Sequence, residues 1–290
     1  MAVTVTGLCR PRSFRMSLVG LSRRSASFRG RDAWVCLEDG KAHGLASIRR
    51  RSGAKSWEIS NLYAGSSPGQ ASVRLLEMAA AGAGTRGGER VFLRVEADSP
   101  IVPIARLAGY FPSHRETVYR RTTRQLGPSH SLFDADSHLR MRRSEDDHAL
   151  FRLYNAATPV KVRQLVGMTL DQWSASHERG PGRPLDSLLQ MEGDVRGWLR
   201  ASARFGTGSL AVRMHPDYDA LTLEVVEAGL RILKGARTVF AVVEEYAPRL
   251  ATAVEELGFE AQGEFVVLVK SVARQVRERT PARSSRAAVE

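Results

Sequence analysis

The sequence has only two cysteines among its 290 residues, Cys9 and Cys36. Two cysteines cannot form a disulfide framework, and the seven histidines are scattered, so no His/Cys cluster has the spacing of metal ligands. No apolar run approaches the ~20 residues that a membrane-spanning helix needs. These absences exclude a disulfide-stapled domain, a zinc module and a membrane-spanning chain, and they favour a protein of the reducing cytoplasm.

Lysine is also scarce, with 5 residues against 38 arginines. Residues 1–130 hold 21 Lys and Arg against 9 Asp and Glu, whereas residues 131–290 hold 22 of each kind. The whole net charge of +12 therefore lies in the first part, notably before Asp32 and at Arg49–Arg51. Such a patch attracts anions, either nucleic acid or a polyphosphate cofactor, but a solvated arginine-rich surface explains it equally well.

The two ends of the chain have biased compositions. Residues 1–30 are rich in Arg and Ser and contain no acid, which is typical of a transit peptide, but residues 3–8 alternate as a strand does. We therefore expect a cytoplasmic protein of bacterial type. Residues 273–290 are polar without an apolar period, and the composition predicts a disordered tail.

The chain contains an internal repeat. Residues 33–50 and 185–204 each predict two strands around a tight turn. The turn glycines, Gly40 and Gly193, are 153 residues apart. In both copies a strand, a helix, a strand, a second helix and a last strand follow in the same order.

The elements of the two copies keep an offset between 148 and 153 residues. The second helix of each copy ends at a glycine that suits a C-terminal cap, Gly109 in the first copy and Gly258 in the second. The pattern predicts tandem modules at residues 1–130 and 131–272. Two unrelated α/β segments that match by chance are the alternative. The other matching elements are strands 56–64 and 208–215, helices 68–82 and 218–234, and strands 90–95 and 237–243.

This element order, with a hairpin first and a helix–Gly–Phe–strand ending, resembles the GNAT superfamily of acyl-CoA N-acyltransferases. The residues that carry the resemblance are EISNLYA at 58–64, LAGYF at 107–111 and ELGFE at 256–260. Residues 143–173 are similar to the opening segment of the family, with Ser144 as a helix cap. The resemblance implies an α/β fold of two tandem GNAT-like modules, each a mixed, mostly antiparallel sheet flanked by helices.

The resemblance also implies acetyl-CoA or another acyl-CoA as cofactor. In the family, the pantetheine inserts between two splayed strands, and the pyrophosphate lies on the amides at the next helix start, where the helix dipole favours an anion. In the first copy the implied cofactor contacts are Leu62, Tyr63, Ala64, Gly69, Gln70, Ala71, Ser72 and Asp98.

The phosphate turn within SSPGQASVRLLE, residues 66–77, departs from the family pattern Arg/Gln-x-x-Gly-x-Gly/Ala. Ser67 replaces Arg/Gln, Gln70 replaces the first glycine, and only Ser72 keeps a small side chain. A capped helix start explains the same residues, with Ser67 as N-cap, Pro68 as first helical residue and Gln70 closing a capping box.

The equivalent turn of the second copy, residues 214–225, has no glycine. Asp217 and Asp219 stand where phosphates would lie, and two carboxylates repel a pyrophosphate at close range. Asp217 suits an N-cap instead. We therefore expect the first copy, rather than the second, to bind the cofactor.

Glu58 is the candidate general base, because the family often places a carboxylate on this strand. Strand alternation puts Glu58, Ser60 and Leu62 on one face, although a surface glutamate explains Glu58 as well. The tyrosine that the family often uses as proton donor is absent, since its two positions hold Ala105 and Val254. Tyr110 and Tyr119 lie nearby in the sequence, and Tyr110 is our candidate for the proton donor. Packing in the hydrophobic core would explain both tyrosines equally well.

Three functions remain open. The leading function is acyl transfer by the first copy to an amine of a small molecule or peptide. We expect no membrane partner, and whether the chain forms a homodimer stays open. The second is a non-catalytic GNAT-fold binding protein. The third and weaker one is nucleic-acid binding; the sequence argues against it because it has no basic strand with interleaved aromatic residues. Only 32 residues precede the first hairpin, against 54 before the second (131–184). In the family this segment forms much of the acceptor site, so the first copy either uses residues of the second copy for this site or has lost its acceptor pocket.

Overall fold

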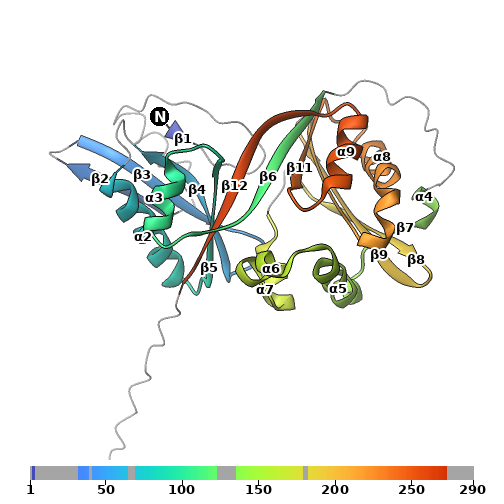
Figure 1. Cartoon of the computed structure of the whole chain (residues 1–290), viewed down its shortest axis with the longest axis horizontal. Helices are drawn as coiled ribbons and strands as arrows, with labels where there is room; N and C mark the ends of the chain where they lie inside the picture. The colour runs from blue at the N-terminus through green and yellow to red at the C-terminus, as the bar shows by residue number, and fades with distance from the viewer. Residues whose placement is uncertain are drawn as a thin grey trace, which may run out of the picture.

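The computed structural model describes residues 2–3, 32–38, 41–64, 69–122, 135–178 and 182–272. The first half of the chain forms one lobe in which two helices pack on a group of strands (Figure 1). Its elements are β1 (Ala2–Val3), β2 (Asp32–Glu38), β3 (Lys41–Arg50), β4 (Ser56–Ala64), α2 (Gln70–Gly84), β5 (Arg90–Glu96), α3 (Ile101–Leu107) and β6 (Phe111–Thr122).

The second half forms a second lobe with the same succession of strands and helices, preceded by short helices (Figure 1). Its elements are α4 (Ala135–His138), β7 (Leu139–Met141), η2 (Ser144–Asp146), α5 (Asp147–Ala157), α6 (Val160–Val166), α7 (Leu170–Ser176), β8 (Leu185–Met191), β9 (Asp194–Arg204), β10 (Thr207–Met214), η3 (Pro216–Leu221), α8 (Thr222–Ile232), β11 (Thr238–Glu244), α9 (Pro248–Glu256) and β12 (Glu260–Ser271).

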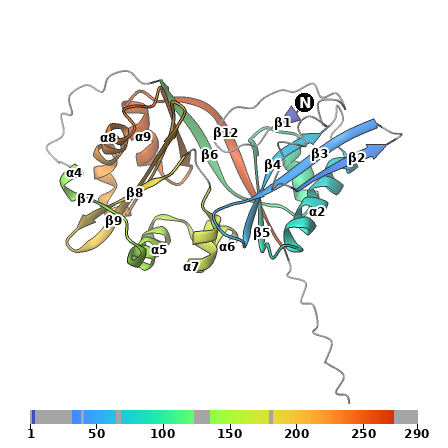
Figure 2. The same ribbon diagram turned by 180° about the vertical axis from the view of Figure 1, so that it is seen from behind.

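All 12 described strands belong to one mixed sheet, in the order β2-β3-β4-β5-β12-β6-β11-β10-β9-β8-β7, with β1 paired to β4. The closing strands are exchanged between the halves. β6 ends the first half but pairs with β11 over seven positions, and β12 ends the second half but pairs with β5 over seven positions. β6 and β12 also pair with each other and bridge the two lobes (Figure 2).

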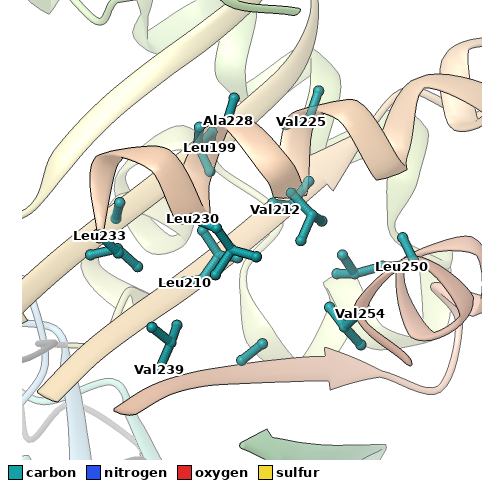
Figure 3. Close-up of a cluster of buried hydrophobic side chains, with 14 of the residues drawn as sticks. Leu199, Leu210, Val212, Val225, Ala228, Leu230, Leu233, Val239, Leu250 and Val254 are labelled. Atoms are coloured by element: carbon teal, nitrogen blue, oxygen red, sulfur yellow. The ribbon is translucent and has the colours of Figure 1, made fainter. Parts of the chain in front are cut away.

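One face of the sheet, here the back face, carries the main cores. In the second lobe, alternate residues of β9 and β10 such as Leu199, Leu210 and Val212 pack against α8 and α9 (Figure 3). Each such side chain contributes about 1.5–3 kcal/mol when fully buried. The equivalent core of the first lobe lies between its strands and α2 and α3, and includes Trp57, Ile59, Leu62, Leu75, Leu76 and Tyr110.

The opposite, front face is covered by α5, α6 and α7, which contact both lobes. Trp173 of α7 and residues of α5 pack on Trp198 of β9, while α6 packs beside Phe92 of β5. Backbone bonds join Ser52 to His177 and Gly53 to Ala175. The helices of the second half therefore cover the front face of the first half as well.

The local turn and cap predictions have mixed outcomes. Gly109 and Gly258 have φ of 80° and 78°, as predicted for residues that follow a helix, and the predicted Glu192–Gly193 turn also has positive φ, at 52° and 85°. The capping box is wrong, because α2 begins at Gln70 with Gly69 as N-cap and no side-chain cap bond.

Two other predicted caps are also wrong. His215, rather than Asp217, caps η3, since its side chain accepts a bond from the Asp217 amide. Ser144 is the first residue of η2 and lies inside a turn capped by Arg143. A 3-10 turn precedes each of the two α-helices, which shifts the first α-helical residue further along the chain.

Several predictions fall outside the described residues: the transit-peptide alternative, the Asp39–Gly40 turn, Ser67 and Pro68, and the tail 273–290. Among the helices that are described, none combines the length and the apolar character needed to cross a membrane.

Candidate functional site

The neighbouring strands β4 and β5 separate part of the way along their length. They pair in parallel only from Ser56↔Arg90 to Glu58↔Phe92, yet β4 runs on to Ala64 and β5 to Glu96. The second half repeats this divergence, because β10 and β11 pair only as far as Leu210↔Ala241. We call these the first and the second opening; each lies where the family resemblance places the cofactor.

A β-bulge distinguishes the first opening. The β3–β4 register passes from Ser47↔Asn61 to Ile48↔Ile59, so Ser60 has no ladder partner on β3, although its hydroxyl bonds to Ser47. Such an extra residue lacks its ladder partner and re-aims its neighbours. In the second half, β10 pairs with β9 over eight consecutive positions without a shift.

The bulge overturns the predicted alternation along β4. Leu62 was expected to share the face of Glu58, but it packs in the back core with Trp57 and Ile59. The one-residue insertion at Ser60 exchanges the two faces beyond it. Leu62 is buried, so any contact that it makes with a ligand in the opening comes from its backbone.

The start of α2 lies at the end of the first opening. Gly69 and Gln70 are exposed, Ala71 is half-buried and Ser72 is buried. The amides at the start of an α-helix have no partner within the helix, although that of Ser72 donates to the Gly69 carbonyl at 3.0 Å, and α2 has no acidic residue in its first turn. These amides are therefore compatible with an anionic group.

The backbone of β4 in the first opening has two neighbours. Tyr63 pairs with Ala2 and Leu62 pairs with Val3, so β1 lies antiparallel to β4 there. On its other edge, β4 pairs with β3 through Tyr63↔Leu45. A ligand that pairs with the backbone at Leu62 and Tyr63 would have to displace β1.

Glu58 lies on the front face within a group of alternating charges, the ion cluster (Arg49, Arg51, Glu58, Arg94, Glu116 and Glu178). One Glu58 oxygen accepts a bond from Arg49, and the other lies 3.0 Å from Nε of Arg51. The side chain of Glu58 is about 10% exposed. Both carboxylate oxygens are therefore engaged by guanidinium groups.

Arg94 of β5 holds the rest of the ion cluster. It donates to Glu116 at 2.7 Å and to Glu178 at 2.6 and 3.1 Å. Burial alone would lower the pKa of Arg94, but the charges of Glu116 and Glu178 raise it. Burial alone would raise the pKa of Glu116, but Arg94 and His114 lower it to about 2. These groups stay charged across the physiological pH range.

The structure does not bring Tyr110 to Glu58. Tyr110 is fully buried in the back core, and its hydroxyl donates to the carbonyl of Leu76 at 3.2 Å. Burial raises the pKa of its phenol. Asp98 is exposed in the turn between β5 and α3, and the side chain of Tyr63 is half-buried.

The second opening is bridged by side chains. Arg213 of β10 donates to Glu244 of β11 at 2.8 Å. The remaining pocket beside this pair has a volume of about 70 Å³ and is lined by Asp219, whose pKa burial raises. Such a space is far below the roughly 300–1,000 Å³ of ligand pockets.

A larger cavity lies on the front face between the lobes, with a volume of about 660 Å³. Its lining includes Arg49 and Arg94 of the ion cluster, His177 after α7, and front-facing residues of β9, β10 and β11. Sequence reasoning missed this cavity and the residues Arg94, Glu116, His177 and Glu178. They lie on separate elements without a motif spacing, so only the fold brings them together.

Comparison with known proteins supports the fold. No protein-family model and no curated protein matches the sequence. A GCN5-related N-acetyltransferase from Sphaerobacter thermophilus matches with a TM-score of 0.53 at 18% identity, over 86% of this chain and 85% of that one. A GCN5-related N-acetyltransferase from Kribbella flavida matches with a TM-score of 0.50 at 12% identity, over 88% and 96%.

A conserved protein of unknown function from Staphylococcus epidermidis matches with a TM-score of 0.51 at 10% identity, over 83% of this chain and 95% of that one. All three matches extend through both halves of the chain. The likeness shows that the chain has the GNAT fold and confirms the α/β fold class predicted from the sequence.

Proposed function

We propose that the protein is an acyl-CoA-dependent N-acyltransferase that transfers an acyl group, such as acetyl, to an amine. In this proposal residues 1–130 and 131–272 are two GNAT-like modules, and the first module carries the reaction. The observation that carries the proposal is the first opening, where β4 and β5 stop pairing after Glu58↔Phe92 and a helix begins beyond the end of β4.

The residues at the first opening fit an acyl-CoA. Once β1 is displaced, the backbone edge of β4 at Leu62 and Tyr63 offers pairing groups for the pantetheine, and the first amides of α2 at Gly69, Gln70 and Ala71 suit a pyrophosphate. Asp98, in the turn after β5, is a further proposed contact. The second opening is unsuited, because the Arg213–Glu244 pair spans it. When bound, the cofactor supplies an activated acyl thioester.

The chain contributes position and charge to the reaction. The bulge at Ser60 bends β4 beside the opening, and the edge of β4 beyond Glu58, which β5 leaves unpaired, is proposed to orient the carbonyl. Glu58, at the last paired position, is the proposed base that receives a proton from the amine. Tyr110 was our candidate donor, but its hydroxyl is bonded within the back core, so the proposal assigns it no proton transfer.

The test is acetyl-CoA binding, measured as a shift of the thermal unfolding temperature. Gln70 is exposed, so Gln70→Glu adds a carboxylate at the helix start without a folding penalty, while it repels a pyrophosphate. A ligand at 100 times its dissociation constant stabilises by about 2.7 kcal/mol, which raises the Tm by a few degrees. We expect this shift in the wild type and in the control Gln262→Glu, and a clear loss in Gln70→Glu.

Catalysis is tested with Glu58→Gln beside Arg49→Gln. Both variants break the same ion pair, but only the first removes the carboxylate. If Glu58 is the base, only Glu58→Gln abolishes turnover, while Arg49→Gln retains it. Absence of any Tm shift with acetyl-CoA or CoA in the wild type would contradict the proposed function.

The second candidate function is a non-catalytic GNAT-fold binding protein. Two observations favour it: both oxygens of Glu58 are held by arginines, and β1 pairs with β4 in the first opening. It predicts that acetyl-CoA is not turned over with any amine, even if it binds.

A further inference from the structure

The 660 Å³ cavity is walled mainly by the sheet of the second half. Along β10 and β11 the back-facing residues enter the core, so the alternating residues Ser209, Phe240 and Val242 face the cavity. Trp198 of β9 completes this wall, and Ser202 and Thr207 add hydroxyl groups. The wall thus combines aromatic and aliphatic surface with small polar groups.

The other end of the cavity reaches the first opening. Arg49 and Arg94 line it there, and Arg49 is the ion partner of Glu58. Glu58 and Phe92 form the last pair before β4 and β5 separate, and Arg94 follows Phe92 on the same face of β5. The cavity therefore lies next to the point where the first opening begins.

The charges along the cavity are balanced. Each lining arginine is paired with a carboxylate: Arg49 with Glu58, Arg94 with Glu116 and Glu178, Arg200 with Asp186, and Arg213 with Glu244. A balanced wall does not stabilise an ammonium ion in preference to a neutral amine. Acyl transfer requires the neutral form, because only that form has a lone pair.

The aromatic wall is held in a fixed orientation. Nε1 of Trp198 donates to Asp186 at 2.9 Å, and Arg200 binds the same carboxylate while its guanidinium lies 4.9 Å from the Trp198 ring centre. His177 contacts Trp198 from the α7 side, with ring centres 5.7 Å apart. Beside Trp198, the half-buried ring of Phe240 lines the cavity and offers an aromatic surface that suits an apolar, planar group of a ligand.

We propose that this cavity binds the acyl acceptor, and that the acceptor is a small primary amine with an aromatic body. The volume lies within the roughly 300–1,000 Å³ of small-molecule sites and is too small for a folded partner. The second half, whose own opening is bridged, thus supplies the acceptor site for the first opening. That the bound amine is acylated rests on the proposed function, whereas the binding of the amine to the cavity does not.

The transfer step follows directly from this placement. The amine nitrogen forms a bond to the acyl carbon, the carbon–sulfur bond breaks, and its electron pair stays on sulfur. The proton that the nitrogen loses ends on that sulfur, so the products are an amide and a thiol. Glu58, the ion partner of the lining residue Arg49, is the proposed carrier for this proton.

Ligand-observed fluorine NMR with 4-fluorophenethylamine tests the cavity without any turnover. Ser209 is half-buried and faces the cavity, so Ser209→Trp fills space there without entering the core. Thr252→Trp is the matched control, because Thr252 is exposed on α9 at the back face. We expect line broadening with the wild type and with Thr252→Trp, and at least a tenfold weaker affinity with Ser209→Trp.

Turnover is then compared using acetyl-CoA with 4-fluorophenethylamine or spermidine. We expect the aromatic amine to be acetylated and Ser209→Trp to lose this activity, while its Tm shift with acetyl-CoA stays. Equal amine binding in Ser209→Trp and the wild type would overturn the site, and a preference for spermidine would overturn the ligand class. If the aromatic amine binds in the cavity but acetyl-CoA does not bind at all, the proposed function fails and the amine site stands.

Discussion

His177 should make the protein less stable as the pH falls from 7 to 5. Its ring lies 4.6 Å from the Trp173 ring and 5.7 Å from the Trp198 ring, measured between centres, and its Nδ1 bonds to the Ser174 carbonyl at 3.1 Å. Burial, with the nearby charge of Arg200, lowers its pKa from 6.5 to about 3. Arg213 opposes protonation as well, and Asp186 favours it less strongly.

The sign and size follow from proton linkage. In the unfolded chain His177 takes up a proton below pH 6.5, whereas in the folded chain it stays neutral down to about pH 3. Its contribution is therefore fully present above pH 6.5 and is lost as the pH falls toward 3. Between pH 7 and pH 5 the loss amounts to about 2 kcal/mol, an upper value because solvent reaches the half-buried ring.

Urea unfolding at pH 7 and pH 5, followed by tryptophan fluorescence, measures this loss. His177→Asn keeps an N–H donor near the Ser174 carbonyl but does not titrate. We expect the free energy of unfolding to fall by up to about 2 kcal/mol more in the wild type than in His177→Asn. Equal losses in the two proteins would refute the reasoning.

Three further predictions concern a glycine packed in the core, a buried hydrogen bond and an ion pair. Gly229→Ala should lower the free energy of unfolding by about 1–3 kcal/mol through overpacking, because its Cβ would lie 2.4 Å from a leucine methyl of β10. Gly235→Ala, with open space around the added Cβ, should leave it unchanged; urea unfolding measures both. Tyr110→Phe should cost about 1 kcal/mol and leave kcat unchanged, because it removes a bond to an α2 carbonyl; a large loss of kcat would contradict this. Arg213→Ala and Glu244→Ala should each destabilise, and a double-mutant cycle should give a coupling of about 0.5–1 kcal/mol; additive losses would show that the pair does not bridge the second opening.

The sequence predicts those features that depend on neighbours along the chain. The order of strands and helices, the positive φ at Gly109 and Gly258, and the turn at Gly193 all follow from local patterns. The GNAT fold follows from the order of the elements. Local patterns were less reliable at helix starts, where turns of 3-10 helix or a glycine cap moved the first residue.

The candidate site depended on tertiary contacts that no local pattern contains. Glu58 was found from the resemblance, but the rest of the ion cluster beyond its own partners, Arg94, Glu116 and Glu178, comes from β5, β6 and the segment after α7. The bulge at Ser60 changes which face Leu62 occupies, and strand alternation cannot anticipate an inserted residue. The acceptor cavity likewise needs both halves in place.

The exchange of β6 and β12 has a consequence for biosynthesis. A chain emerging from the ribosome presents β5 long before β12, because β5 ends at Glu96 and β12 begins only at Glu260. Until then the edge of β5 has no partner, and unpaired strand edges promote association with other chains. During synthesis this edge of β5 in the first half therefore stays unpaired until β12 has been translated.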